Sequence, residues 1–147
     1  MSITQEDNLS LEEVLEICQN IRNENVEIIK DNLIRPKTVE FLEKYEIDDD
    51  YAKDIIRSLN RNDYYQGPVE DTNPKYVHPF WIFIKLINKL EIKVYIKIKI
   101  INHKRKIIVF SIHEEGKYKI WKKKKHIVNH AIKMLIITLK NQQEKAQ

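Results

Sequence analysis

The chain has 147 residues, of which 42% are hydrophobic and 33% charged; this is enough for about one domain and excludes a disordered or fibrous chain. Its net charge of +4 is unevenly divided, because residues 1–73 carry eight basic and eighteen acidic side chains, whereas residues 74–147 carry eighteen and four. The lone Cys18 excludes an internal disulfide, and the start MSITQEDNLS lacks the apolar stretch of a secretory signal, so we expect a cytoplasmic protein.

The first predicted element is one long or broken helix from about Leu11 to Lys30. Ser10 precedes it as an N-cap, and Glu13 completes a capping box three residues later. Apolar residues then recur at helical spacing, at Val14, Leu15 and Cys18 and further along at Ile21 and Ile28.

A second predicted helix begins near Lys37, after the interruption by Pro36, and ends before the acidic run 48–50. That run is well placed as the cap and first turn of a third helix, residues 51–60, because carboxylates stabilise the positive end of a helix dipole. Three aspartates could also hold a metal ion, but nothing nearby has ligand spacing, so a helix start is preferred. Glycine and proline among polar residues then predict a loop over 61–79.

After this loop the hydrophobic period changes to two, which predicts strands at 80–87, 92–101 and 106–114. In the second strand Val94, Ile96, Ile98 and Ile100 face a core, and Lys93, Tyr95, Lys97 and Lys99 face the other way. In the third strand the same alternation assigns Ile108, Phe110 and Ile112 to one face and Val109, Ser111 and His113 to the other.

A hairpin loop centred on Lys104 sets Tyr95 opposite His113 and Lys97 opposite Ser111. One sheet surface is therefore expected to carry Lys93, Tyr95, Lys97, Lys99, Ser111 and His113, bordered by Trp81 or Phe83 from the first strand. The basic second half favours a polyanionic partner; the alternative is that the two halves pack against each other by charge.

The last predicted element is a helix over 126–145, with an apolar stripe that predicts packing on the sheet. The second interpretation is a membrane-surface helix preceded by Lys122 to Lys125. Its apolar run is too short to span a bilayer, so no membrane partner is expected. His126 and His130 lie four residues apart on this helix, but no third ligand is in view, so no metal site is predicted.

The predicted surface is suited to RNA. Lysines take phosphates, aromatic rings stack on unpaired bases, and the 2′-hydroxyl of RNA is an internal nucleophile that needs only a base. Imidazole groups exchange protons near neutral pH, so Tyr95 and His113 are the candidate proton-transfer pair, and no cofactor or metal is required.

Four pieces of the sequence, IIRSLNRNDYYQGP, WIF, VYIKIKI and VFSIHEE, together resemble the MqsR family of mRNA endoribonuclease toxins over about Lys37 to Glu115. The resemblance implies an α+β fold of the RelE/ParE-like kind, with N-terminal helices packed on a twisted antiparallel sheet. It divides the chain into an acidic helical extension (1–36), a toxin domain (37–118) and a basic C-terminal helix packed on that domain (119–147). The implied function is the toxin of a type II toxin-antitoxin system, a metal-independent endoribonuclease that cleaves single-stranded mRNA and binds a cognate antitoxin.

The resemblance also implies site residues. Tyr95 matches the family tyrosine, whereas Gln66 stands at a family lysine, Ile82 at a family glutamine, and His113 at a lysine that relatives also replace by histidine. The site residues are then Tyr95, His113, Lys97 and Gln66 for catalysis and Lys93, Lys99, Trp81 and Ser111 for RNA binding. The lost glutamine keeps a first alternative open, a non-catalytic RNA-binding module on the same fold. A second alternative is a protein whose basic sheet binds an acidic protein partner, its own N-terminal half included.

Overall fold

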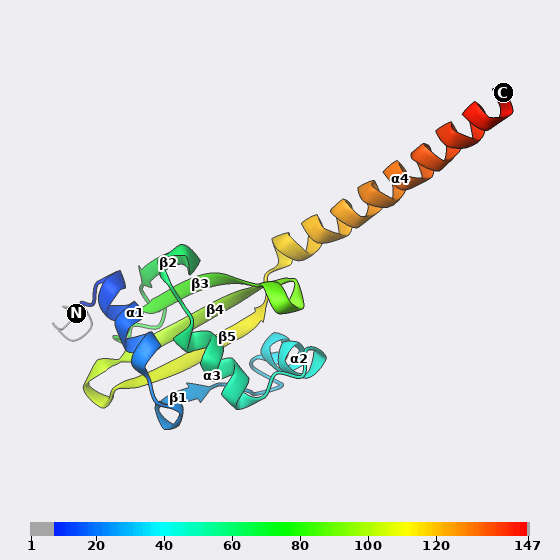
Figure 1. Cartoon of the computed structure of the whole chain (residues 1–147). Helices are drawn as coiled ribbons and strands as arrows, with labels where there is room; N and C mark the ends of the chain where they lie inside the picture. Colours follow the sequence, from blue (N-terminus) through cyan, green and yellow to red (C-terminus); the bar gives the residue numbers. More distant parts are fainter. Residues whose placement is uncertain (1–7, 147) are drawn as a thin grey trace. The chain divides into compact units, whose positions relative to one another are not determined.

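The computed structural model describes residues 8–146 (Figure 1). The chain divides into two units, one ending at Glu115 and the other beginning at Gly116, and each is described by itself. The first unit is α+β, with three α-helices and one five-stranded mixed sheet. Its helices are α1 (Leu11–Asn20), α2 (Pro36–Lys44) and α3 (Asp49–Arg57), and the sheet order is β1 (Val26–Ile28), β5 (Lys106–Glu114), β4 (Ile92–Ile101), β3 (Phe80–Ile87) and β2 (Tyr64–Val69).

Helix caps begin α1 and α3 where the sequence predicts them. The N–H of Glu13 donates to the Ser10 hydroxyl at 3.1 Å and the Glu13 carboxylate accepts from the N–H of Ser10 at 3.1 Å, which completes the predicted capping box. The carboxylate of Asp48 accepts from the N–H of Tyr51 at 2.8 Å, so the acidic run does begin a helix. The predicted helix from Leu11 to Lys30 is wrong in its second half, because α1 ends at Asn20 and the chain then turns extended to form β1.

The sheet is larger than the sequence predicts. The three predicted strands are confirmed with their bounds, but β2 lies inside the predicted loop 61–79 and β1 inside the predicted first helix. Strand β1 runs parallel to β5, so the sheet is mixed and the expectation of a purely antiparallel sheet is wrong. Both extra strands lie at sheet edges, where short segments need only one partner and carry weak sequence signals.

One face of this sheet, called the core face, packs against all three helices. Trp81, Phe83, Val94, Ile96 and Ile98 share one apolar cluster with residues from α1, α2 and α3. Within α1, Val14, Leu15 and Cys18 are between 0% and 8% exposed, and burial raises the pKa of the Cys18 thiol to about 12. Residues 8–36 therefore contribute to the same core as the sheet, although the sequence suggests a separate extension.

A β-bulge in β5 allows apolar side chains on both sides of the bulge to point to the core face. Ser111 lies opposite Lys97, but the next pair toward the hairpin is Ile98 with Val109, which leaves Phe110 as an extra residue. Ile107, Val109 and Ile112 are all at most 1% exposed. The prediction that Val109 faces away from the core and Phe110 toward it is therefore wrong, because strict alternation fails at the bulge.

The end of β5 beyond its pairing with β1 is held by side chains. The Nε–H of Arg35 donates to the carbonyl of Phe110 at 2.6 Å, and the hydroxyl of buried Thr38 accepts from the N–H of Ile112 at 3.2 Å. Both groups come from the start of α2 and take the place of a neighbouring strand. These two bonds hold β5 at the bulge and at Ile112, the residue before His113.

The second unit is the helix α4, Gly116–Ala146. The helix begins ten residues earlier than the predicted start at 126. The apolar side chains of its predicted stripe are exposed, as at Val128 (54%) and Leu135 (59%), so packing of this helix on the sheet stays a prediction. Of the helices within residues 8–146, none combines the length and apolar content needed to cross a bilayer.

Candidate functional site

Tyr95 and His113 meet on the face of the sheet opposite the core, called here the outer face. They are register partners on β4 and β5, as the sequence predicts, and so are Lys97 and Ser111. The two rings are stacked, with centroids 5.0 Å apart and planes 20° apart. Both residues are partly buried, so the pair is accessible while its orientation is restricted by neighbouring strands.

The hydrogen bond made by His113 assigns roles to its two nitrogens. Nδ1 lies 3.0 Å from the carbonyl oxygen of Glu114. Because a carbonyl oxygen only accepts, Nδ1 carries the proton of this bond, and in the neutral ring Nε2 has the free lone pair. The imidazole therefore presents a base on Nε2, oriented by the strand backbone through Nδ1.

Tyr95 has the opposite character. Burial raises the pKa of its phenol, and the nearby phenol of Tyr65 on β2 raises it further. The phenol therefore keeps its proton at neutral pH and can donate it in a hydrogen bond or to a leaving group. The stacked pair thus combines a base and an acid on adjacent strands.

A second row of residues crosses the sheet beside this pair. Gln66, Ile82, Lys97 and Ser111 are successive register partners from β2 to β5. The ammonium of Lys97 lies 4.1 Å from the centroid of the Phe80 ring, a cation–π contact that positions its charge while leaving the residue partly exposed. Gln66 is exposed and Ile82 is 7% exposed, so an apolar residue separates the amide of Gln66 from Lys97.

Lys99 lies on the same face, but it is not available at the surface. It is 4% exposed, and its ammonium forms an ion pair at 2.7 Å with Asp71 from the loop between β2 and β3. Three rings surround the same ammonium, with Phe80 at 4.4 Å, Tyr76 at 5.1 Å and Phe110 at 5.2 Å. The prediction that Lys99 is exposed on this surface is therefore wrong, whereas its role in RNA binding stays a prediction.

The prediction that Trp81 or Phe83 borders the outer face is also wrong. Trp81 pairs with Ile98 and Phe83 with Ile96, so both rings are on the core face, where they are 3% and 0% exposed. The residues of β3 on the outer face are Phe80, Ile82, Ile84 and Leu86, which pair with Lys99, Lys97, Tyr95 and Lys93. Lys93 is thus on the predicted face, near the start of β4.

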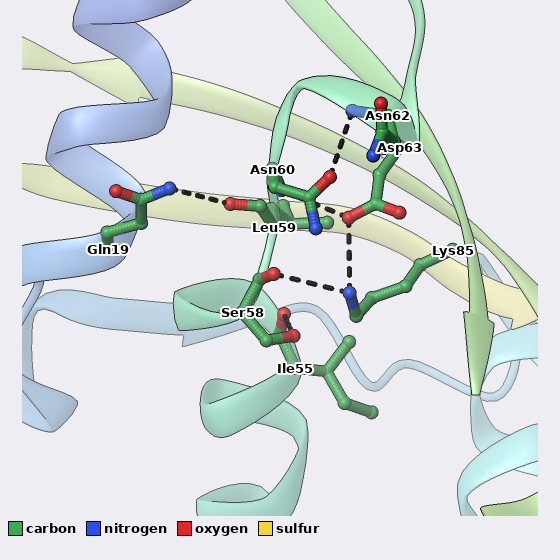
Figure 2. Close-up of polar contacts among 8 residues, drawn as sticks. All are labelled: Gln19, Ile55, Ser58, Leu59, Asn60, Asn62, Asp63 and Lys85. Carbon is green, nitrogen blue, oxygen red and sulfur yellow. Dashed lines mark hydrogen bonds and ion pairs between the residues drawn. The ribbon is translucent and has the colours of Figure 1, made fainter. Parts of the chain in front are cut away.

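The aspartate of the motif NDYYQG has a structural role. The carboxylate of Asp63, 9% exposed as a residue, accepts from the N–H of Asn60 at 3.0 Å and pairs with the ammonium of Lys85 at 3.1 Å (Figure 2). Lys85 also donates to the carbonyl of Ser58 at 3.2 Å, which ties the end of α3 to β3. This cluster fixes where β2 begins and hence where Tyr65 and Gln66 lie beside the outer face.

Sequence reasoning missed the surroundings of Lys99. Phe80 carries a signal, since its register partner is a lysine of the outer face, but the run FWIFI is apolar throughout and hides the alternation. Asp71 carries no local signal, because its contact with Lys99 spans 28 residues of sequence. Among the described residues, no three His, Cys, Asp or Glu side chains gather as metal ligands would.

Comparison of the chain with protein-family models, curated proteins and solved structures finds no match.

Proposed function

We propose that this protein is an endoribonuclease that cleaves single-stranded RNA at the stacked pair Tyr95 and His113. The observation that carries the proposal is the placement of an acid and a base 5.0 Å apart, centroid to centroid, on a face that also presents Lys97. The resemblance to MqsR-family toxins supports the same assignment at Tyr95 and His113. It also supports a RelE/ParE-like fold and a type II toxin bound by a cognate antitoxin, as parts of this proposal.

The geometry supports the following reaction. Nε2 of His113 accepts the proton of a 2′-hydroxyl, whose oxygen attacks the adjacent phosphorus. The bond from phosphorus to the 5′-oxygen breaks, and that oxygen takes the phenolic proton of Tyr95. The products are a 2′,3′-cyclic phosphate and a 5′-hydroxyl. Proton exchange with solvent then restores the phenol and the free imidazole nitrogen.

The surrounding residues assist this step. Lys97 faces the phosphate and stabilises the negative charge that develops on its oxygens. The hydroxyl of Ser111, opposite Lys97, and the exposed amide of Gln66 hydrogen-bond the nucleotides on either side. The exposed ring of Tyr65 next to Tyr95 replaces Trp81 as the platform for a base, because Trp81 is in the core.

The test is cleavage of a labelled single-stranded RNA in EDTA by the purified chain. We expect cutting, and a loss of at least about 100-fold in the double variant Tyr95→Phe, His113→Ala, the lower end of what acid–base catalysis contributes. A matched double variant, Tyr51→Phe with His130→Ala, changes the same residue types on α3 and α4, which contribute no strand to the outer face, and should cut at the wild-type rate. RNA left intact by the wild type, or cut equally by the Tyr95 and His113 variant, contradicts the proposal.

The burial of Ile82 favours a second candidate function, an RNA-binding module without cleavage. The family glutamine at this place could reach a substrate, whereas a side chain that is 7% exposed and lacks polar atoms can neither donate nor accept a hydrogen bond. This candidate predicts that RNA is retained intact, with an affinity that falls steeply as salt rises.

A further inference from the structure

We propose that Asp71 occupies a phosphate-binding site of the outer face, so that RNA must displace this carboxylate before Lys99 can bind it. The inference rests on the proposed function, because it names a phosphate of single-stranded RNA as the competing ligand. It adds an autoinhibitory contact that is built from the loop between β2 and β3.

The first support is the position of Lys99 in the row of lysines on β4. Lys97 and Lys99 are two residues apart on one face, so their side chains leave the strand about 7 Å apart. Lys97 is partly exposed, whereas Lys99 is covered. The same face therefore holds one lysine ready for an anion and one lysine that already has an anion bound.

The second support is the way in which Asp71 is held. One carboxylate oxygen accepts from Lys99 at 2.7 Å, and the other accepts from the N–H of Asn73 at 2.9 Å. These two hydrogen bonds, and the positive charge of Lys97, hold the pKa of Asp71 below its ordinary value. An oxyanion bound between an ammonium group and a backbone N–H is the coordination that a phosphate oxygen would also receive.

The third support is that the covering segment is an exposed loop. The Asx turns at Asp71 and Asn73 are local, because Asn73 bonds to Lys75 through its side chain at 3.0 Å and to Tyr76 through its carbonyl at 3.0 Å. Tyr76 is 57% exposed although its ring covers the ammonium of Lys99. The loop can therefore leave the sheet with no apolar core of its own to disrupt.

The experiment measures binding of a 2′-O-methyl single-stranded RNA, which cannot be cleaved through a 2′-hydroxyl, by fluorescence anisotropy at several salt concentrations. Asp71→Asn keeps the shape of the side chain and its bond with Asn73 but removes the charge that holds Lys99. We expect affinity to rise by about tenfold, the lower end of the effect of one hydrogen bond to a charged group. The slope of log affinity against log salt should steepen by about 0.7, which corresponds to one further phosphate contact on a single strand.

The matched control is Glu70→Gln, which removes one negative charge from the neighbouring residue of the same loop. It should change affinity by less than twofold. Adding Lys99→Gln to Asp71→Asn should abolish the gain, because the new contact is to Lys99. Melting curves establish that each variant is folded.

Hydrogen exchange of the wild-type chain gives a second readout that needs no variant. Bound RNA should speed exchange at the N–H groups of Asn73 and Lys75, since their turns lose the ion pair with Lys99 that holds this loop on the sheet. An Asp71→Asn variant that behaves like Glu70→Gln, or exchange in this loop that RNA slows or leaves unchanged, overturns the inference. If wild type and Asp71→Asn both fail to bind RNA, both the proposed function and this inference fail. If both bind RNA equally well, only the inference fails.

Discussion

The core face and the outer face of the sheet take alternate residues of the same strands, but different neighbours determine what each residue does. On the core face, Val94, Ile96 and Ile98 are fully buried in the cluster that includes three helices. On the outer face, Tyr95 and Lys97 remain partly exposed, while the next residue in the row, Lys99, is buried by a loop. Position in a strand therefore predicts burial on the core face, whereas availability on the outer face depends on tertiary contacts.

The largest expected effect is on stability. If the N-terminal residues belong to the core, their removal should unfold the first unit. Deleting residues 1–35 removes the buried side chains of Val14, Leu15, Cys18, Ile21 and Val26 and the strand β1. We expect loss of the cooperative unfolding transition in circular dichroism melting. The control Leu33→Ser changes an apolar side chain of the same segment that is 94% exposed, and should alter the free energy of unfolding by no more than about 0.5 kcal/mol. A deletion variant that melts cooperatively would contradict the shared core.

The next largest effect is expected from substitutions at Trp81, which test whether this residue belongs to the core face or to the outer face. Trp81→Ala should lower the free energy of unfolding by about 3–5 kcal/mol, the cost of emptying a buried aromatic site. Trp81→Phe should lose much less stability and should keep RNA binding, because the ring does not reach the outer face. Denaturant unfolding and RNA binding of the two variants check this. A folded Trp81→Phe variant that has lost RNA affinity would show that Trp81 contributes to RNA binding.

Lys97 tests the outer face without disturbing the core. Lys97→Met keeps an unbranched chain over the Phe80 ring but removes the charge near the proposed phosphate. We expect RNA cleavage to slow by about 100-fold, the lower end of effects seen when one charge-stabilising donor is removed, with an unchanged melting temperature. Lys37→Met, an exposed lysine on α2, removes the same charge and should cleave normally. Equal cleavage rates for the two variants would show that Lys97 has no role in the reaction.

The smallest predicted effect is a pH dependence of the free energy of unfolding, caused by Tyr45 at the edge of the core face. Tyr45 donates a hydrogen bond to the carboxylate of Glu114, and burial together with this bond raises the pKa of Tyr45 from 10.0 to about 12. Below pH 10 the phenol is protonated in both states and its contribution is complete. As pH rises from 10 toward 12 the unfolded state loses the proton first, so stability falls.

The comparison of wild type with Tyr45→Phe isolates this contribution from the other groups that titrate above pH 10. Their difference in unfolding free energy should shrink by under about 1 kcal/mol between neutral pH and roughly pH 10.5. Urea unfolding at several pH values measures it. A difference that stays constant with pH would show that the Tyr45 phenol is not held by Glu114.

Alternation along β4 was enough to predict which of its residues lie in the central part of the candidate site. The run KVYIKIKI places lysines and Tyr95 on one face, and the predicted pairing of Tyr95 with His113 is confirmed. The hairpin centred on Lys104 is wrong, because Ile101 pairs with Lys106 next to the turn; the bulge at Phe110 then restores the predicted register. Alternation failed at Phe110 because a bulge inserts one residue, and no local pattern in the sequence indicates this bulge, where Arg35 and Thr38 bond to β5. A one-residue insertion exchanges the faces of the residues beyond it.

The remaining errors have a common physical cause. In FWIFIKLI nearly every residue is apolar, so the side on which Trp81 lies is set by its pairing with β4 and not by its own pattern. The short strand β1 exists because β5 has a free edge to pair with. Asp71 reaches Lys99 only after the chain between them has folded. Each of these features depends on contacts between distant segments.

The most direct test of the central claim uses one RNA and the DNA of the same sequence, incubated with the wild-type chain in EDTA. The proposed reaction needs the 2′-hydroxyl as the nucleophile, with His113 as base and Tyr95 as acid. We predict that the RNA is cut, that its fragments end in a 2′,3′-cyclic phosphate and a 5′-hydroxyl, and that the DNA stays intact. DNA cut at a comparable rate, or RNA fragments ending in a 3′-hydroxyl and a 5′-phosphate, would contradict the mechanism.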